Sequence, residues 1–361
     1  MDSSALEKYQ VKYQMTNNQL KILIVQTAFI GDVVLALPLA QVLHKKLPEA
    51  QIDFVAIPRT SDLLTNHPAI SNIIIYDKRG KDKGVFGLLR LVNHLKTQNY
   101  DVAIVPHRSI RSALLVYLAR CVKRIGFNKS AAKFLFTDVV RYPASMHEVQ
   151  RNITLLRPMA ILHQAKESPV VHPTEEDRKV VDKLLFDEEL LDTKKLVAVA
   201  PGAVWNTKRW TEEGYIELIK KLISGGYHVT MIGGKEDQPL CENIIKFVGI
   251  GRVFNSAGKL SLLQSAELIK RCRVLVSNDS APVHLAAAVN TPVVVIFGAT
   301  VPAFGFGPYS DGSVIVQIND LKCRPCAIHG GNKCPIKTFD CMKRITADIV
   351  FDKVMRVFYS L

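Results

Sequence analysis

The chain has 361 residues, of which 48% are hydrophobic and 22% charged. This length favours two domains, and the composition argues against a disordered or fibrous protein. No apolar run reaches the roughly 18 residues that a membrane-spanning helix needs. The first twenty residues are polar and lack the apolar stretch of a signal peptide, which predicts a cytoplasmic protein with reduced thiols.

The formal net charge of +14 is unevenly distributed. Residues 1–170 carry 23 Lys and Arg against 12 Asp and Glu, whereas residues 171–361 carry 24 against 21. The first half therefore suits an anionic partner, such as a phosphorylated glycan, an acidic membrane surface or a nucleic acid. Its basic residues are scattered along apolar, helix-like sequence without interleaved aromatic side chains, so nucleic acid is the weakest of these options.

Short apolar runs predict strands in the first half at 21–26, 51–57, 72–76 and 101–106. Helix-like stretches lie between them at 33–46, 84–98 and 111–122. This alternation predicts a parallel sheet with both faces covered. Residues 149–189 look mostly helical, but Pro169 and Pro173 interrupt them, which places a hinge there.

The second half repeats the pattern, with strands predicted at 195–202, 226–234, 274–278 and 293–298 and helices at 213–226 and 261–272. Two Rossmann-like α/β domains facing a central cleft are therefore expected, over residues 1–170 and 171–345. Apolar residues spaced by three and four predict a last helix at 346–361, which is expected to pack back on the first domain.

Neither half carries G-x-G-x-x-G after its first strand, nor a P-loop motif, which argues against a nicotinamide dehydrogenase or a P-loop NTPase. Ligands of open parallel sheets bind beyond the carboxyl ends of the strands. The loop TAFIGD follows the first strand, and its Gly31 permits a tight turn before Asp32 at a helix start. Asp32 is either a carboxylate favoured by the helix dipole or a general base.

The loop PGAVWNTKRW opens the second domain. Gly202 and Ala203 would let backbone amides approach a ligand, and Lys208 and Arg209 add positive charge. The loop is either a basic turn around a core Trp or a diphosphate clamp with Lys208 on the phosphates. The next loop, IGGKEDQ, holds Glu236 and Asp237, acids that either contact a ribose or are simply solvated.

The stretch SNDSAPVHLAAAVNTP leaves a strand and enters an Ala-rich helix. Asp279 or Ser280 is expected to cap this helix, whose small residues leave backbone N–H groups open to a phosphate. His284 is either a packed core histidine or a donor to a phosphate or sugar. Thr300, after the following strand, lies on the same side of the predicted sheet.

Three ordered motifs resemble the ADP-heptose:lipopolysaccharide heptosyltransferases, and they span residues 21–302. They read TAFIGDVVLALPLAQVL, PGAVWNTKRWTEEGYIELIKKL and NDSAPVHLAAAVNTPVVVIFGATVP. The resemblance implies a GT-B fold and inverting transfer of heptose from ADP-L-glycero-D-manno-heptose to the lipopolysaccharide inner core. It implies that the first domain binds the acceptor and the second the nucleotide sugar, without a catalytic cofactor.

The family's catalytic base falls on Asp32 and its phosphate-binding lysine on Lys208. The other substrate-binding positions implied by the resemblance, or favoured by the loops above, are Gly31, Gly202, Ala203, Arg209, Glu236, Gln238, Leu260, Asp279, Ser280, Ala281, His284 and Thr300. Two positions depart from the family pattern. Ala281 replaces a glycine, and the family's ribose-contacting acid falls near Gln238, with Glu236 close by. The implied partners are ADP-heptose, a phosphorylated lipopolysaccharide core and the cytoplasmic surface of the inner membrane, but no nucleic acid.

The spacing C-x₂-C-x₇-C-x₆-C, over Cys323, Cys326, Cys334 and Cys341, predicts a structural zinc site in a reduced compartment. A loop with disulfides or free thiols is the alternative reading. A similar Cys-rich segment occurs in the heptosyltransferase II branch of the family, and the chain resembles that branch most.

Other functions stay open on the sequence. The chain could use another nucleotide sugar or acceptor, or bind a nucleotide sugar without turnover. The pairing of Asp32 with Lys208 argues against a pure binder, because a binder needs no base. A hydrolase or an epimerase on the same fold is also compatible, although an epimerase would need further acids in the cleft.

Overall fold

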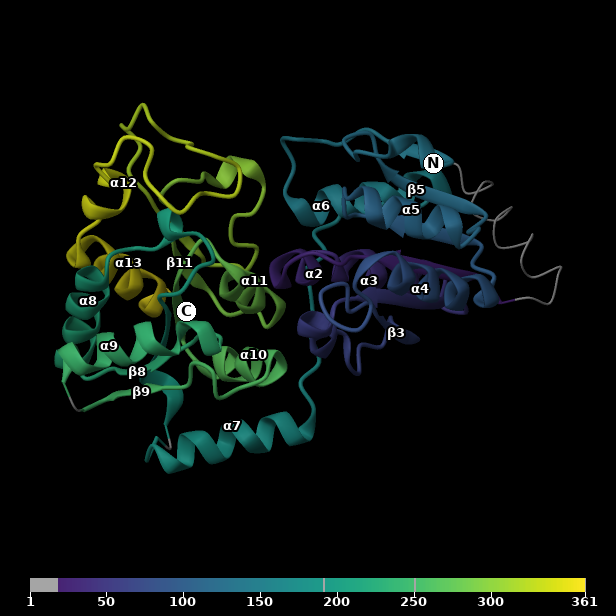
Figure 1. Cartoon of the computed structure of the whole chain (residues 1–361). Helices are drawn as coiled ribbons and strands as arrows, with labels where there is room; N and C mark the ends of the chain where they lie inside the picture. The colour runs from purple at the N-terminus through teal and green to yellow at the C-terminus, as the bar shows by residue number, and fades with distance from the viewer. Residues whose placement is uncertain (1–18, 191, 250, 361) are drawn as a thin grey trace. The chain divides into compact units, whose positions relative to one another are not determined.

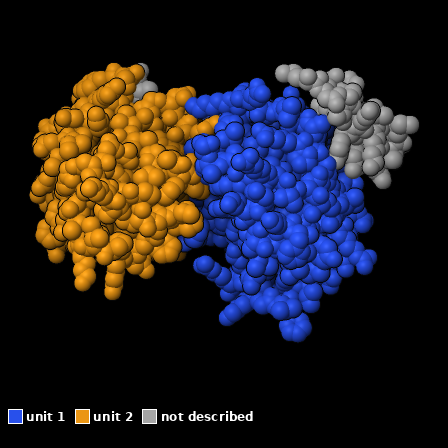
Figure 2. Space-filling model, turned by 90° about the horizontal axis from the view of Figure 1, so that it is seen from above, with its two compact units in different colours: residues 1–172 blue, residues 173–361 orange. Residues whose placement is uncertain are grey.

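A computed structural model describes residues 19–190, 192–249 and 251–360 (Figure 1). Residues 1–18, most of the polar stretch that predicts no signal peptide, lie outside this range. The chain forms two compact units, residues 1–172 and 173–361, which Figure 2 colours separately. None of the helices in the described ranges combines the length and hydropathy that a bilayer crossing requires.

The first unit contains a parallel six-stranded sheet in the order β3-β2-β1-β4-β5-β6. Its strands are β1 (Lys21–Val25), β2 (Gln51–Ala56), β3 (Asn72–Ile75), β4 (Val102–Val105), β5 (Lys123–Phe127) and β6 (Asp138–Val140). The four predicted strands are confirmed. The sequence reading missed β5, which opens with two cations, and β6, which has three residues.

The helices of the first unit are α2 (Ile30–Val34), α3 (Leu37–Lys46), α4 (Gly84–Gln98), α5 (Ile110–Leu118) and α6 (Glu148–Ile153), with short 3₁₀ turns at Pro58–Leu64, Lys133–Leu135 and Thr154–Met159. The predicted helix at 33–46 is broken between α2 and α3, because Pro38 has no backbone N–H to donate and sits in a first helical turn. Helices α4 and α5 pack side by side, and their apolar residues share one core with β1 and β4.

The second unit repeats the strand order, as β12-β11-β10-β7-β8-β9. Its strands are β7 (Leu196–Ala200), β8 (His228–Met231), β9 (Val253–Asn255), β10 (Val274–Asn278), β11 (Val293–Ile296) and β12 (Val314–Val316). The four predicted strands are confirmed here too, whereas β9 and β12, with three residues each, were not predicted. Both sheets are thus Rossmann-like, which confirms the predicted fold class.

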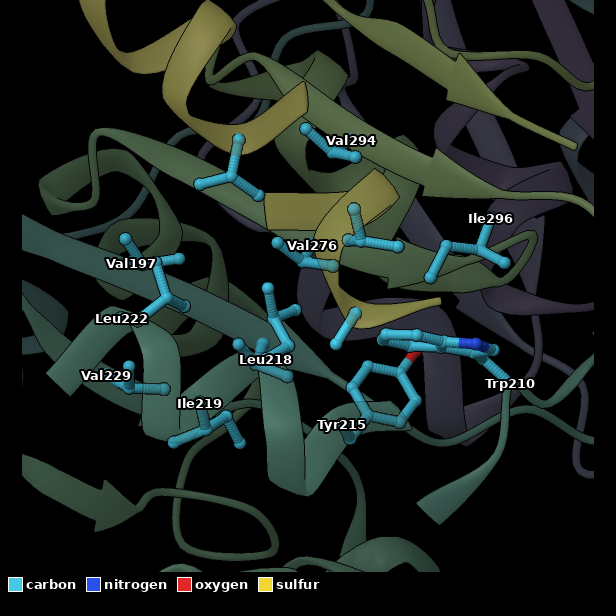
Figure 3. Close-up of a cluster of buried hydrophobic side chains, with 14 of the residues drawn as sticks. Val197, Trp210, Tyr215, Leu218, Ile219, Leu222, Val229, Val276, Val294 and Ile296 are labelled. Atoms are coloured by element: carbon cyan, nitrogen blue, oxygen red, sulfur yellow. The ribbon is translucent and has the colours of Figure 1, made fainter. Parts of the chain in front are cut away.

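The helices of the second unit are α7 (Glu175–Asp187), α8 (Glu212–Ser224), α9 (Gln238–Val248), α10 (Leu262–Arg271), α11 (Ala281–Ala288), α12 (Asp340–Lys343) and α13 (Ala347–Tyr359), with 3₁₀ turns that include Asn206–Lys208 and Lys235–Asp237. Figure 3 shows the core of this unit, where Trp210 and Tyr215 pack with Leu218 and Val276.

The last helix, α13, has its apolar face in the second unit. Its buried residues Val350, Val354 and Val357 belong to the core of the second unit, and the helix packs on α8 and on strands β10 to β12. The expected contact of this helix with the first domain stays a prediction. The spacing predicted the helix correctly, but a single sequence does not tell which core an apolar face enters.

The chain is anchored on both sides of the boundary between the units. Gln41 of α3 donates to the Ser168 carbonyl (2.9 Å), and its own side-chain oxygen accepts from the Val170 N–H (3.0 Å). On the other side, Thr174 and Asp177 form a capping box that starts α7. Only a few residues connect these two fixed points.

Candidate active site

Each sheet reverses its strand order at one point, between β1 and β4 in the first unit and between β7 and β10 in the second. In parallel sheets the ends of the strands at such a reversal form the usual ligand site. Asp32 follows β1, Lys208 follows β7, and Asp279 follows β10. The three main predicted residues therefore all lie beside a reversal point of their own sheet.

Asp32 occupies the first turn of α2. One of its carboxylate oxygens, Oδ2, accepts a hydrogen bond from the backbone N–H of Phe29 at 3.1 Å, so the side chain helps to start the helix. Asp32 and Gly31 are both half-buried, which keeps this carboxylate in reach of solvent or substrate. The capping role predicted as one alternative is present, and it is compatible with a second role as a base.

The loop that leads to Asp32 is held by residues that the sequence reading did not single out. Lys78 Nζ donates to the Thr27 carbonyl at 2.6 Å, and His107 Nδ1 lies 3.3 Å from Thr27 Oγ1 and 3.0 Å from Ser112 Oγ. Burial, with the charges of Lys78 and Arg108 nearby, lowers the pKa of His107 to about 4. A neutral imidazole after β4 thus braces the loop after β1.

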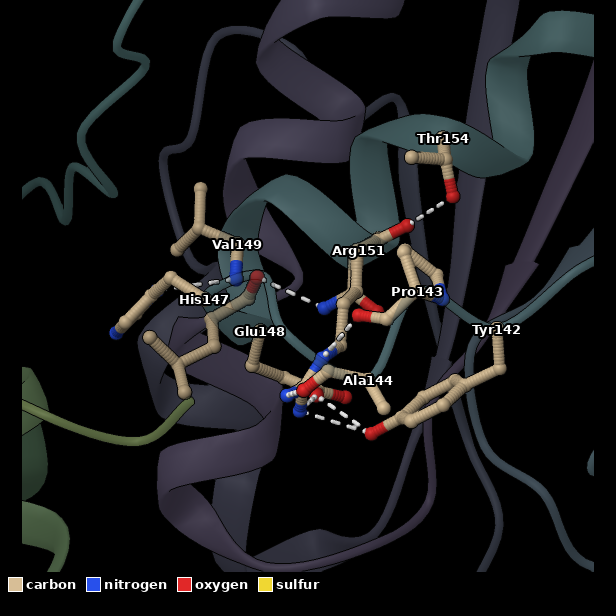
Figure 4. A network of polar contacts seen from close by, with 10 residues as sticks. Tyr142, Pro143, Ala144, His147, Glu148, Val149, Arg151 and Thr154 are labelled. Atoms are coloured by element: carbon tan, nitrogen blue, oxygen red, sulfur yellow. Dashed lines mark hydrogen bonds and ion pairs between the residues drawn. The ribbon is translucent and has the colours of Figure 1, made fainter. Parts of the chain in front are cut away.

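A buried arginine orders the loop after β6 (Figure 4). Arg151 is 2% exposed and donates to Glu148 Oε2 (2.8 Å), to the Tyr142 hydroxyl (2.9 Å) and to the Pro143 carbonyl (3.1 Å). The Tyr142 ring also faces the Arg108 guanidinium, 4.8 Å away. The network therefore sets the position of Arg108, a cation at the start of α5.

In the second unit, Lys208, Asp279 and Thr300 form one polar group. Lys208 Nζ lies 2.7 Å from Asp279 Oδ2, and Thr300 Oγ1 donates to the same oxygen at 2.6 Å. Asp279 and Thr300 are buried, whereas the Lys208 side chain is 17% exposed. An ammonium group is thus held in one place by a buried carboxylate, on a side chain that is partly exposed.

Asn278, the last residue of β10, connects the loops around this group. It is fully buried, its amide donates to the Pro201 carbonyl (2.7 Å), and its side-chain oxygen accepts from the Trp210 N–H (2.9 Å) and the Tyr215 hydroxyl (3.0 Å). It therefore fixes both ends of the Lys208 loop against β10. This role of Asn278 has no sequence signature, because most of its hydrogen-bond partners are backbone groups.

The start of α11 corrects one prediction. Ser280 is the N-cap by position, but its hydroxyl accepts no hydrogen bond from the helix and donates instead towards the Gly202 carbonyl at 3.3 Å. The Asp279 carboxylate does not cap the helix either, because it pairs with Lys208 and accepts from Thr300. The Ala281 N–H therefore has no side-chain cap, whereas Pro282 has no N–H and the Val283 N–H donates to the Ser280 carbonyl at 3.1 Å. His284 lies buried on this first turn.

The loop IGGKEDQ packs directly on the loop PGAVWNTKRW. A Cβ atom at Gly202 would lie 2.2 Å from Asp237 Oδ1, so glycine is needed there to admit Asp237. Packing against Asp237 thus explains the glycine at position 202, in addition to the predicted approach of a ligand to the backbone. Glu236 is exposed, and Gln238 begins α9 and donates to Glu242 at 2.8 Å. Half-buried Leu260 follows β9 on a separate loop of the same edge, and Arg209 donates to the Ala203 carbonyl at 2.8 Å.

The Cys-rich segment supports the same site from the other side. Arg324 Nη2 donates to the Thr300 carbonyl at 2.8 Å, and Arg324 also donates to the Gly298 carbonyl. Gly330 has a φ of +81°, and a Cβ atom there would lie 3.2 Å from Lys208 Cγ. The segment thus touches the stem of Lys208 and braces the loop that carries Thr300. Neither contact was predicted.

The zinc site predicted for Cys323, Cys326, Cys334 and Cys341 is not assembled. In the ranges that the structure describes, no three Cys, His, Asp or Glu side chains are grouped so that they could hold a metal ion. All four are free thiols. Cys341 is buried in the core of the second unit, where burial raises its pKa to about 11, whereas the other three lie in the partly exposed loop.

The chain is similar to known proteins over most of its length. The model of glycosyltransferase family 9 (heptosyltransferase) matches residues 88–333. Lipooligosaccharide heptosyltransferase 2 of Haemophilus influenzae is 31% identical over 315 residues, which cover 83% of this chain and 89% of that protein. These matches confirm the resemblance to the family and to its heptosyltransferase II branch.

Solved structures agree. The structure of the Escherichia coli ADP-heptose lipopolysaccharide heptosyltransferase II has a TM-score of 0.76 and 25% identity, and covers 94% of this chain and 99% of that one. A glycosyl transferase family 9 structure from Veillonella parvula has a TM-score of 0.86 with 20% identity, and covers 95% and 98%. With the family match, these likenesses show that the chain belongs to glycosyltransferase family 9, the heptosyltransferases, and is a glycosyltransferase with the GT-B fold.

Proposed function

We propose that this enzyme transfers heptose from ADP-L-glycero-D-manno-heptose to the phosphorylated inner core of lipopolysaccharide, with inversion at the anomeric carbon. Family membership and the heptosyltransferase 2 relatives support the sugar and the pathway. The similar Escherichia coli protein is an ADP-heptose lipopolysaccharide heptosyltransferase, which supports ADP-heptose as the donor.

The donor is assigned to the second unit, and the group of Lys208, Asp279 and Thr300 carries this assignment. The Lys208 side chain is 17% exposed, and its ammonium group is held 2.7 Å from Asp279 Oδ2. Beside it, the first turn of α11 lacks a side-chain cap. A fixed cation together with the uncapped Ala281 N–H at the start of the helix suits a diphosphate, because both stabilise the negative charge that gathers on the leaving ADP.

The acceptor is assigned to the first unit, with Asp32 as the base. Asp32 takes the proton of the attacking acceptor hydroxyl, whose oxygen bonds to the anomeric carbon as the bond from that carbon to the diphosphate breaks. The electron pair of the broken bond leaves with ADP, and Lys208 stabilises it without a metal ion. The excess of cations in the first half suits a phosphorylated, lipid-linked acceptor and contact with the inner membrane surface.

The proposal is tested by following nucleotide release with the purified enzyme. ADP-heptose with a heptosylated lipid A–Kdo acceptor should release ADP, and omission of the acceptor should stop the release. UDP-sugars and other ADP-sugars serve as matched donors. Release without acceptor would indicate a hydrolase, and preference for another donor would indicate a different sugar specificity.

A further inference from the structure

The first unit exposes large apolar side chains where α4 and α5 begin. Phe86 is 85% exposed and Val85 is 67% exposed, both on the first turn of α4, and Ile110, the first residue of α5, is 59% exposed. The two helices are neighbours on one face of the sheet, and each follows a strand, so both begin at its carboxyl edge. Three large apolar side chains therefore face water at the starts of these two neighbouring helices.

In the loop before α4, both acids are engaged in contacts close to the loop, and two of the lysines are exposed. Buried Asp82 accepts from the Asp77 N–H (3.0 Å) and pairs with Arg90 (3.3 Å), and the Asp77 carboxylate accepts from the Lys81 N–H (3.1 Å). Lys81 and Lys83 are exposed, and neither has an ion-pair partner among the described residues. The two acids thus build the loop, and the lysine charges stay uncompensated.

We propose that Lys81, Lys83, Val85, Phe86, Ile110 and Arg111, here named the helix-start patch, dock this enzyme on an anionic lipid bilayer. The apolar side chains enter the headgroup boundary, and the cations around them meet the lipid phosphates. Charge complementarity selects this partner: the charged residues of the patch are exposed and all positive, and a bilayer surface supplies many negative charges in one plane.

The location of the patch agrees with this partner. The loop that carries Lys81 and Lys83 also carries Lys78, which donates to the Thr27 carbonyl in the loop of Asp32. A bilayer bound at this edge would hold a lipid-anchored acceptor near the proposed base. Only the benefit of docking, the delivery of a lipid-anchored acceptor to Asp32, rests on the proposed function. Lipid binding itself is measured without donor or acceptor.

The test is sedimentation of the full chain with vesicles of phosphatidylcholine alone and of phosphatidylcholine with one third phosphatidylglycerol. We expect binding to the anionic vesicles, weakened about tenfold or more by Phe86→Ser. Lys81→Ala and Lys83→Ala should each weaken it about fivefold, and raised salt should remove most of this charge effect.

Two control variants match the exposure of the patch residues. Val122 is 71% exposed beside Arg120 and Arg124, at the far end of α5, and Phe186 is 71% exposed on α7 next to Asp187. Val122→Ser and Phe186→Ser should leave vesicle binding unchanged. If Val122→Ser weakens it as much as Phe86→Ser does, the patch is not the docking surface.

Three further measurements separate the outcomes. Phe86→Trp adds a fluorophore to a unit without tryptophan, and its emission should shift to the blue and be quenched by brominated lipid. Melting temperature and turnover of a deacylated, water-soluble acceptor should not change in Phe86→Ser, since this side chain is exposed.

Equal vesicle binding by Phe86→Ser and the unchanged chain would overturn the proposal, as would a patch-dependent dimer in sedimentation velocity. If the unchanged chain binds vesicles but shows no acceptor-dependent release of ADP, the result would count against the proposed function instead.

Discussion

The two sheets of this enzyme share one strand order, yet the groups at their carboxyl edges are arranged differently. In the second unit, the residues beside the reversal point satisfy one another: Lys208 pairs with Asp279, and Asn278 bonds to the loop of Lys208. In the first unit, Lys78 and His107 brace the loop of Asp32, and the exposed Lys81 and Lys83 have no ion-pair partner in the described part of the chain. One scaffold thus holds a preformed, internally paired site and an open cationic one.

This difference fits the two substrates proposed here. A nucleotide diphosphate is small and uniform, so a rigid cradle of fixed groups suits it. A phosphorylated glycolipid is large and variable, and a cationic edge attracts it without one fixed geometry. The strand order therefore fixes where a ligand binds, and the side chains after each strand decide which ligand it is.

The largest effect should come from Asp32. Asp32→Asn keeps an oxygen that can accept from the Phe29 N–H, so α2 should still form, but it removes the base. We expect acceptor-dependent ADP release to fall by about 10²–10⁴-fold. ADP-heptose binding, measured by calorimetry, should persist, because the donor is assigned to the other unit. Near-normal turnover in this variant would refute Asp32 as the base.

Lys208 tests the paired site of the second unit. Lys208→Met keeps the aliphatic stem and removes the charge that faces Asp279. Turnover should fall by roughly 10²–10³-fold, and the donor KM should rise, since a fixed charge no longer meets the diphosphate. Arg209→Met is the control, because Arg209 is the neighbouring cation and donates to the Ala203 carbonyl. Equal losses in both variants would mean that general positive charge, and not the Lys208 position, matters.

Asn278 should matter chiefly for stability. Asn278→Ala leaves the Pro201 carbonyl and the Trp210 N–H buried without their partner, which should cost roughly 3 kcal/mol of unfolding free energy. Thermal and urea denaturation measure this loss. Asn206→Ala, in the loop of Lys208 but at an exposed position, should change stability by less than about 0.5 kcal/mol.

The pH dependence of stability should differ between the units. Burial, with the charges of Lys78 and Arg108, lowers the pKa of His107 from 6.5 to about 4. The folded first unit therefore favours neutral His107, and this stability is present above pH 6.5 and is lost as the pH falls towards 4. The loss should be on the order of 2 kcal/mol, seen as a lower melting temperature at pH 5. His107→Gln should reduce this dependence without removing it, because burial and the nearby His172 also lower the pKa of His67 to about 4; an unchanged slope would contradict it.

The smallest effect concerns Gly330. Gly330→Ala places a methyl group 3.2 Å from Lys208 Cγ at a φ of +81°, which should cost about 1 kcal/mol and raise the donor KM severalfold. Gly249 also has a positive φ, +98°, but nothing lies within 4 Å of a Cβ atom there. Gly249→Ala should therefore share the backbone cost and leave the donor KM unchanged. Kinetics on both variants decide whether the Cys-rich segment positions Lys208.

Much of the fold could be predicted from local patterns, and the failures have local causes. Strands such as Lys21–Val25 and Leu196–Ala200 are apolar runs, as buried parallel strands require. The strand Val253–Asn255 is too short to show any period, and Lys123–Phe127 begins with charges. The break at Pro38 was missed because proline is accepted in a first helical turn, where no signal separates a kink from a new start.

The candidate site could be predicted only where one loop contains the signal. Lys208 and Asp279 were each chosen from their own loops, but their ion pair depends on β7 lying next to β10, which no single loop reveals. The roles of Asn278 and Arg324 depend on distant backbone carbonyls, which have no sequence signature. The Cys spacing predicted a zinc site because it ignores burial, and Cys341 enters the core instead.

The anchors on either side of the unit boundary limit how this enzyme can flex. Gln41 holds Val170, and the Thr174 capping box fixes the next helix, so residues 171–173 alone supply the adjustable torsions. Pro173 removes one of them, because its ring fixes φ. Any pivoting between the halves is thereby concentrated in a very short tether. Lengthening it with glycines would loosen that coupling while leaving the chemistry of each half untouched.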